Sequence, residues 1–387
     1  MKLWGVSVSY FTGKLEAYLR YKGIPYELAH PYADSSRIRA GAGAIQVPII
    51  ERDDGRFMSD TTPIIREFEK EYPDHPVMPS DPVVRFVALL MEDYADEWLW
   101  RAAMHYRWSY EHGRELLSRI LADEVTSHVR LPRILRRNLL KYRQRMGFVV
   151  GDGVSNETWD HVEQGYRNAL KFMTLMLERR PYLLGDTPSV ADFGFMGPMM
   201  RHFSQDPDPT AIMRWEGPAV FEWVGRVWNA RAATGAPSFL GEVPEDAMPL
   251  LNEIAETHMV QLAENALAFA RGDDRFQMHV QGCQYRRLPV SRYRVYCLEQ
   301  LREQFAALDP ASREKVQSIL HQPAYDLIWA DTVSAQSRYD PERLAPYNKS
   351  INVFEGNPAA ARIEAVFNSI RKILTRQGRG GTPSQSP

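Results

Sequence analysis

Residues 1–28 read MKLWGVSVSYFTGKLEAYLRYKGIPYEL, and they decide the fold of the first part of the chain. The segment KLWGVSVS (2–9) has the composition of a β-strand, and IPYELAH (24–30) has that of a second strand. Between them, KLEAYLRYKG (14–23) has a helical pattern that ends at Gly23. Strand, helix and strand in this order predict a right-handed βαβ unit with a parallel strand pair.

A bend rich in hydroxyl groups, Ser9-Tyr10-Phe11-Thr12-Gly13, separates the first strand from the helix. Ser and Thr at a helix start commonly cap the helix by accepting from its first backbone N–H groups. The same hydroxyls could instead hold a ligand at the helix N-terminus. The bend alone leaves both interpretations open.

The following fifty residues continue the alternation of strands and helices. SSRIRAGAGAIQ (35–46) predicts a loop or short helix, and VPIIE (47–51) and RFMS (56–59), joined by an Asp-Gly turn, predict an antiparallel hairpin. SDTTPIIREFEKEYP (59–73) predicts a helix that stops before its final proline. The predicted order is therefore βαβαββα.

Two breaks rich in proline or glycine divide the rest of the chain: PDHPVMPSDP (73–82) and RAATGAPSFLGEVPEDA (231–247). After the first break strand signals largely vanish and long amphipathic helical patterns begin. The last dozen residues have few apolar side chains, which predicts disorder. We predict an α/β domain at 1–78, an all-helical domain at 83–232, a mostly helical extension at 233–375 and a disordered tail at 376–387.

Composition indicates an ordinary globular protein of 387 residues with a net charge of -2, which gives no global signal for nucleic-acid binding. The two cysteines, Cys283 and Cys297, argue against a disulfide framework and against a cysteine-based zinc site, and Cys297 fits a buried apolar position. We find no signal peptide and no apolar run long enough to span a bilayer. A cytoplasmic protein without a transmembrane segment is expected.

Several motifs in a fixed order resemble the glutathione transferase superfamily over about residues 1–230. They are the βαβαββα order, Val47-Pro48 before the third strand, Asp60-Thr61 at the next helix start, and the all-helical second domain. Gly185-Asp186 followed by SVAD (189–192) also resembles the capping motif of the family's second domain, and we use it as evidence for the fold only. The resemblance implies a thioredoxin-like first domain that holds glutathione and a helical domain that supplies the pocket for an electrophile.

The resemblance also implies roles for the hydroxyl-rich bend. Its spacing to Gly23 places Ser9 where the serine-using, theta- and zeta-like branches keep the serine that stabilises the glutathione thiolate. Tyr10 is the second candidate for this role, since the tyrosine-using branches have a longer segment between their tyrosine and the end of the helix. Thr12 is the third candidate. Capping without chemistry stays an alternative for all three.

Two other pairs would hold the glutathione backbone. Val47 and Pro48 resemble a loop in which a cis-proline lets the preceding residue pair with the cysteinyl part; a proline starting an edge strand is the alternative. Asp60 and Thr61 would bind the γ-glutamyl end, through the helix N-terminus and an acceptor for the α-ammonium. Plain helix capping is compatible with this role.

The first long helix of the second domain carries further candidates. An apolar co-substrate pocket could be lined by Tyr94, Trp98, His105 and Trp108, although core packing explains the same residues equally well. Glu92, Asp96 and His105 share a helical face, which metal sites sometimes use; a row of this kind more often pairs with arginines, so no metal is expected.

These observations lead to two hypotheses. The first is a glutathione transferase-like enzyme, as the resemblance implies, with glutathione as co-substrate, a small electrophilic substrate, a detoxification role and a homodimeric state. The second is a non-catalytic binding protein that keeps the fold and works through its extension. The extension, from about residue 233, has no counterpart in ordinary family members.

Overall fold

The computed structural model describes residues 1–126, 129, 131–232, 237–330 and 333–350. The tail predicted at 376–387 lies outside the described residues, as do residues 351–375. In the first domain the elements are β1 (Lys2–Trp4), α1 (Tyr10–Lys22), β2 (Glu27–Ala29), α2 (Ser35–Ala42), β3 (Ile49–Glu51), β4 (Phe57–Ser59) and α3 (Thr61–Glu71). This is the predicted order βαβαββα.

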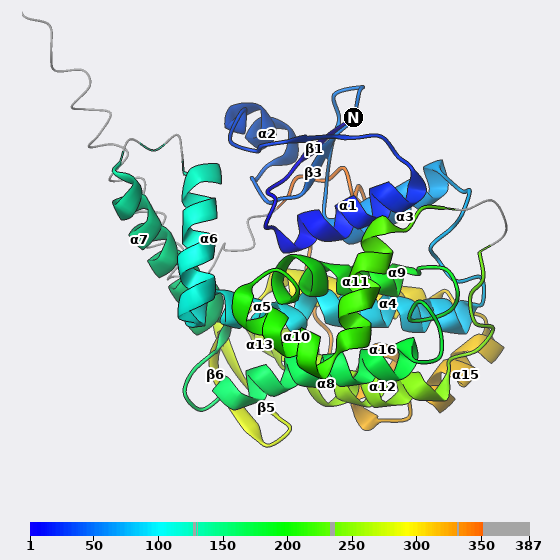
Figure 1. Cartoon of the computed structure of the whole chain (residues 1–387). Coiled ribbons are helices and arrows are strands. Elements are labelled where there is room, and N and C mark those ends of the chain that lie inside the picture. The colour runs from blue at the N-terminus through cyan, green and yellow to red at the C-terminus, as the bar shows by residue number, and fades with distance from the viewer. Residues whose placement is uncertain (127–128, 130, 233–236, 331–332, 351–387) are drawn as a thin grey trace, which may run out of the picture.

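The four strands of the first domain form one sheet in the order β2-β1-β3-β4. β1 pairs in parallel with β2, whereas β3 is antiparallel to both β1 and β4. Helix α1 ends at Gly23, whose φ of 68° is the left-handed conformation that glycine adopts without a Cβ penalty. The sheet and α1–α3 thus form the expected thioredoxin-like domain (Figure 1).

The second domain is all helical. Its helices are α4 (Pro82–Glu97), α5 (Leu99–Ser109), α6 (Glu111–Glu124), α7 (Arg133–Gln144), α8 (Trp159–Leu177), α9 (Val190–Pro198), α10 (Pro207–Glu216) and α11 (Pro218–Asn229), with π-helical turns η1 (Arg145–Val149) and η3 (Met199–Phe203). Ser189 and Asp192 form the predicted capping box at the start of α9. Asp192 also accepts from Trp223 Nε1 at 3.0 Å, so the cap joins α9 to α11.

The extension adds helices α12 (Met248–Ile254), α13 (Val260–Arg271), α14 (Arg292–Ala306), α15 (Pro310–Ile319) and α16 (Asp326–Trp329), with the π-helical turn η5 (Ala255–Met259) between the first two. It also contains a β-hairpin, β5 (Arg275–Val280) and β6 (Cys283–Pro289), that the sequence analysis missed. The signal was present: Phe276, Met278 and Val280 alternate as buried residues, and Gln281-Gly282 turns with φ of 48° and 78°.

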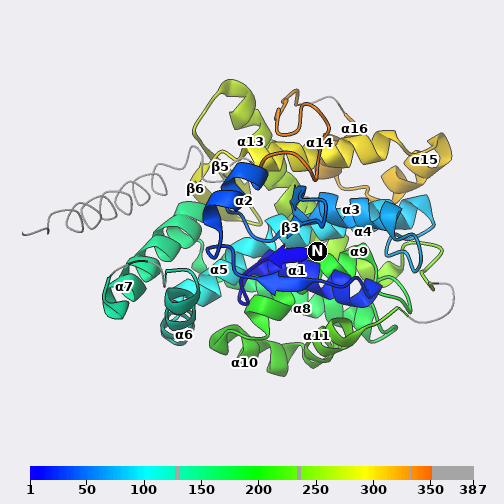
Figure 2. The ribbon, with the colours of Figure 1, turned by 90° about the horizontal axis from the view of Figure 1, so that it is seen from above.

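Helices α14 and α15 of the extension pack against α4, on the side of the molecule opposite α10 and α11 (Figure 2), and α12 packs against α8 and α4. Arg66 of α3 donates to Gln300 of α14 at 2.7 Å, and Arg294 of α14 pairs with Glu97 of α4 at 3.3 Å. The segment after α16 then crosses the edge of the sheet, where Ser59 N–H donates to the Pro346 carbonyl at 2.9 Å. Within the described part of the chain, no helix combines the length and apolarity needed to cross a bilayer.

Candidate functional site

Three chain segments meet at one end of the sheet. In the strand register Trp4 pairs with Ile49, and Ile49 pairs with Ser59. The bend that leads to Ser9 follows β1, Pro48 immediately precedes Ile49, and Asp60 immediately follows Ser59. The register therefore brings the three predicted parts of the glutathione site to the same end of the sheet, although they are far apart in the sequence.

Ser9 is the N-cap of α1. Its Oγ accepts from the Thr12 backbone N–H at 3.3 Å, and its side chain is partly exposed. The capping interpretation is thus correct for Ser9. It does not exclude chemistry, because a hydroxyl that accepts one hydrogen bond keeps its own proton for a second partner.

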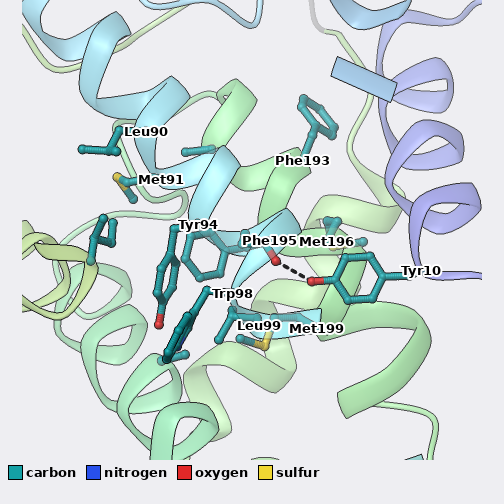
Figure 3. Close-up of a cluster of buried hydrophobic side chains, with 14 of the residues drawn as sticks. Tyr10, Leu90, Met91, Tyr94, Trp98, Leu99, Phe193, Phe195, Met196 and Met199 are labelled. Carbon is teal, nitrogen blue, oxygen red and sulfur yellow. Dashed lines mark hydrogen bonds between the residues drawn. The ribbon is translucent and has the colours of Figure 1, made fainter. Parts of the chain in front are cut away.

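Tyr10 points away from this end of the sheet. Its side chain is only 1% exposed, and its hydroxyl donates to the Ala95 carbonyl at 2.5 Å, within an apolar cluster between α1, α4 and α9 (Figure 3). Burial, and to a lesser extent Asp96, raises the pKa of Tyr10. Thr12 is also buried, with its side chain against Gly5, so it lies beneath the bend.

Val47 and Pro48 form the loop that enters β3. The peptide bond between them is cis, as the resemblance implied. Val47 is partly exposed, whereas Pro48 is buried. Because β3 lies between β1 and β4, this loop lies between the Ser9 bend and the start of α3.

Asp60 and Thr61 form the start of α3. Asp60 has a φ of 72° and a ψ of 115°, a sparsely populated conformation for a residue with a Cβ, and its side chain makes no capping bond to the helix. The first backbone N–H groups of a helix have no partner within it, which makes this N-terminus suited to a carboxylate. Burial raises the pKa of the Asp60 carboxyl to about 7, and a hydrogen bond from Tyr293 opposes that effect.

Glu92 and Asp96, which the sequence analysis expected to pair with arginines, instead share a buried lysine that it did not select. Lys14 of α1 is 0% exposed, and its Nζ lies 2.5 Å from both Glu92 Oε1 and Asp96 Oδ2 of α4. Burial lowers the pKa of Lys14, but the two carboxylates outweigh burial, so its pKa is raised. Glu92 and Asp96 stand one helical turn apart, and this spacing was the available signal for a shared cation.

Arg107 fixes the bend that carries Ser9. Its guanidinium is buried, pairs with Asp206 through Nε at 2.7 Å and through Nη2 at 3.0 Å, and donates from Nη1 to the Val8 carbonyl at 2.7 Å. Val8 directly precedes Ser9. The second domain therefore holds the backbone of the bend through one arginine whose charge is balanced.

The four residues proposed for a co-substrate pocket, Tyr94, Trp98, His105 and Trp108, are all at least 95% buried in the helical core. They match core packing, the alternative given above. The residues considered for a metal site have other partners: His105 lies 3.1 Å from Glu163, and Glu92 and Asp96 both pair with Lys14. In the described residues, no group of three or more His, Cys, Asp or Glu has the arrangement of a metal site.

Three other aromatic side chains lie beside the start of α1 and remain partly exposed: Phe11, Trp100 of α5 and Phe148 of η1. The rings of Phe11 and Trp100 are stacked with centroids 5.8 Å apart, and Phe148 meets Trp100 edge-on at 5.7 Å. An apolar surface next to Ser9 is therefore present, built from residues that the sequence analysis did not select.

Residues 3–76 match the family model described as "Glutathione S-transferase, N-terminal domain". "Glutathione S-transferase U8" of Arabidopsis thaliana is 30% identical over 120 residues, which make up 30% of this chain and 53% of that protein. "Glutathione S-transferase U6" of the same plant is 26% identical over 120 residues, with the same two shares. This chain spans about half the length of the curated relatives it matches.

Solved structures with a similar fold include the β-etherase LigF of Sphingobium sp. strain SYK-6, at 18% identity and a TM-score of 0.42, covering 58% of this chain and 93% of that one. Another is a glutathione S-transferase of Methylobacterium radiotolerans in complex with glutathione sulfonate, at 16% identity and a TM-score of 0.37. The match covers 62% of this chain and 99% of that one. The chain has the glutathione S-transferase fold followed by extra helices, and the family match and curated relatives support that superfamily.

Proposed function

We propose that this protein is a glutathione transferase-like enzyme, which transfers the glutathione thiolate to a small electrophilic substrate. The observation that carries the proposal is the row of Ser9, Val47-Pro48 and Asp60-Thr61 along one end of three neighbouring strands. Strands lie about 4.8 Å apart, so the row spans about 10 Å, close to the length of an extended tripeptide.

Each part of glutathione would have a matching group in this row. The γ-glutamyl carboxylate would bind the N–H groups at the start of α3 with the Thr61 hydroxyl, and the α-ammonium would bind Asp60. The Val47 backbone beside cis-Pro48 would pair with the cysteinyl backbone. This order places the cysteinyl thiol toward the bend and Ser9.

Ser9 would stabilise the thiolate, as in the serine-using, theta- and zeta-like branches. A free thiol has a pKa of about 8.5, and a hydrogen-bond donor at a helix N-terminus favours its charged form. The Ser9 hydroxyl already accepts from Thr12 N–H, so its proton is free to point at sulfur. Attack then forms the carbon–sulfur bond as the electrophile's leaving group departs with the electron pair, and the rate gain comes from thiolate formation and positioning.

The electrophile would lie against Phe11, Trp100 and Phe148, the partly exposed aromatic cluster beside the start of α1. Aromatic walls at a domain junction suit an apolar co-substrate. No metal enters this proposal. A homodimer and a detoxification role complete it, as the resemblance to the superfamily implies, together with the cytoplasmic location expected from the two cysteines and the lack of a signal-peptide pattern.

The proposal is tested by calorimetry with glutathione and by turnover with a general aromatic electrophile. Wild type should bind and turn over, and Ser9→Ala should reduce kcat/KM at least about tenfold while raising the pKa of the bound thiol. Ser7→Ala removes a neighbouring hydroxyl that instead donates to Glu124, and should leave kcat/KM unchanged. Absence of glutathione binding to wild type would refute the proposal.

Tyr10→Phe separates the two hydroxyls of the bend. Because the Tyr10 hydroxyl donates to the Ala95 carbonyl inside the core, its removal should cost about 1 kcal/mol of stability and leave the bound thiol pKa unchanged. If Tyr10→Phe abolishes turnover and Ser9→Ala does not, the assignment of Ser9 is wrong.

A further inference from the structure

The extension reaches the proposed γ-glutamyl site through α14. The Tyr293 hydroxyl donates to Asp60 Oδ2 at 2.9 Å, across 233 positions of the sequence. The Tyr293 ring is held from behind by Tyr339, whose ring meets it edge-on at 5.2 Å, and by Tyr296 at 6.0 Å. The hydrogen bond fixes one oxygen of a carboxylate that makes no cap to its own helix.

A small cavity opens behind this hydrogen bond, between α3, α4 and α14. Its volume is about 30 Å³, and five carboxylates line it. They belong to Asp60, Glu92, Asp93, Asp96 and Glu97. A cavity of this size holds about two water molecules, which is the scale of a primary ammonium group and too small for a tripeptide.

The charges around the cavity leave an acceptor unused. Lys14 pairs with Glu92 and Asp96, His258 lies 2.6 Å from Asp93, and Arg294 pairs with Glu97. Arg66 also lines the cavity, and its guanidinium donates to Gln300. Asp96 is 8% exposed, and its Oδ1 has no hydrogen-bond partner among the described residues. A buried carboxylate oxygen without a donor is costly, so the cavity is suited to a group that brings N–H donors and positive charge.

We propose, resting on the function proposed above, that the extension completes the γ-glutamyl site: Tyr293 is a positioning residue that holds Asp60 toward the α-ammonium, and the acidic cavity receives that ammonium. The site is then built from three units of one chain, with Asp60 from α3, Asp96 from α4 and Tyr293 from α14. The extension thereby determines specificity for a free amine at this end of the ligand.

The ionisation of Asp60 should make ligand affinity depend on pH, which gives the inference a second test. Only the carboxylate form attracts an ammonium, so affinity should rise with pH through the pKa of Asp60, at about 7. Tyr293 lowers that pKa by its hydrogen bond, and its removal should move the rise to higher pH. The charged or titratable groups that face Asp60 or line its cavity are Lys14 from α1, Arg66 from α3, Glu92, Asp93, Asp96 and Glu97 from α4, Tyr293, Tyr296 and Cys297 from α14, and Tyr339.

The test is calorimetric binding of S-methylglutathione, which has no titrating thiol, and of its analogue without the α-amino group. Tyr293→Phe should weaken binding of S-methylglutathione about tenfold at neutral pH, shift the midpoint of its pH dependence upward, and leave the deaminated analogue unaffected. Tyr325→Phe, which removes a buried hydroxyl of the extension that donates to the Leu251 carbonyl and does not line this cavity, should match wild type in all three measurements.

The outcomes separate the two proposals. No binding of S-methylglutathione to wild type refutes the proposed function and this inference with it. If wild type binds and Tyr293→Phe matches it, the inference alone fails. If Tyr293→Phe weakens both ligands equally without a shift in the pH midpoint, Tyr293 has only a structural role, and the inference is again overturned. Thermal unfolding of each variant verifies that it is folded.

Discussion

Replacement of Lys14 by methionine should break a buried electrostatic contact between the first two domains. Lys14 is 0% exposed, and the side chains of its partners Glu92 and Asp96 are 4% and 10% exposed. Methionine keeps the volume of the aliphatic stem but leaves two buried carboxylates without a cation. Removing one partner of a buried ion pair costs about 3–5 kcal/mol, and we expect a loss of that size in the free energy of unfolding at neutral pH.

The loss of stability caused by Lys14→Met should be smaller in acid than at neutral pH. The pKa of Lys14 is raised, so its stabilising effect is fully present below the pKa of an unfolded lysine, about 10.4, and constant across the acidic and neutral range. Burial already raises the pKa of Asp96, and loss of Lys14 raises it further. The native variant then binds more protons than its unfolded form as pH falls, so its deficit relative to wild type should shrink in acid.

Equilibrium urea unfolding followed by tryptophan fluorescence, at about pH 5 and about pH 8, measures both effects. Lys70→Met is the matched control, since it breaks an exposed pair with Glu67 whose lysine is 77% exposed, and should change stability by less than about 0.5 kcal/mol. A loss below about 1 kcal/mol for Lys14→Met at pH 8, or a loss that does not narrow at pH 5, would refute the reasoning.

Two further substitutions test the co-substrate surface and the packing of the second domain. Phe148→Ala should raise KM for an aromatic electrophile several-fold while KM for glutathione stays constant in steady-state kinetics; equal changes in both would contradict the assigned surface. Gly194→Ala should lower the free energy of unfolding by about 1–3 kcal/mol, because the new Cβ would lie 2.8 Å from the Glu92 Cα. Gly225→Ala, whose Cβ meets nothing within 4 Å in α11, should instead stabilise by about 0.5–1 kcal/mol, and a loss there would show that helix propensity was misjudged.

Local patterns predicted much of the fold, because they act within a few residues. Gly23 ends α1, the Asp-Gly turn joins β3 to β4, and Ser189 with Asp192 starts α9, as expected. The helical pattern over residues 84–108 predicts the one long helix assigned to the start of the second domain, yet the structure divides it at Trp98, between α4 and α5. The Gln281-Gly282 hairpin was missed because its strands lie between strong helical patterns.

The candidate site was predictable in part. The prediction selected Ser9, Val47-Pro48 and Asp60-Thr61 by resemblance, and the register brings them together. It also selected Tyr10, a conspicuous side chain that points into the core, because a sequence does not say toward which domain a helical residue points.

By itself, the sequence determined the order of strands and helices, the caps and turns that bound them, and the separation into an α/β unit followed by helical ones. Those features depend on periodicity and on backbone preferences of residues near each other in the chain. Only the tertiary structure decided which charges meet: Lys14 with Glu92 and Asp96, and Asp60 with Tyr293. These contacts join residues 78 to 233 positions apart, and packing rather than local preference brings such residues together.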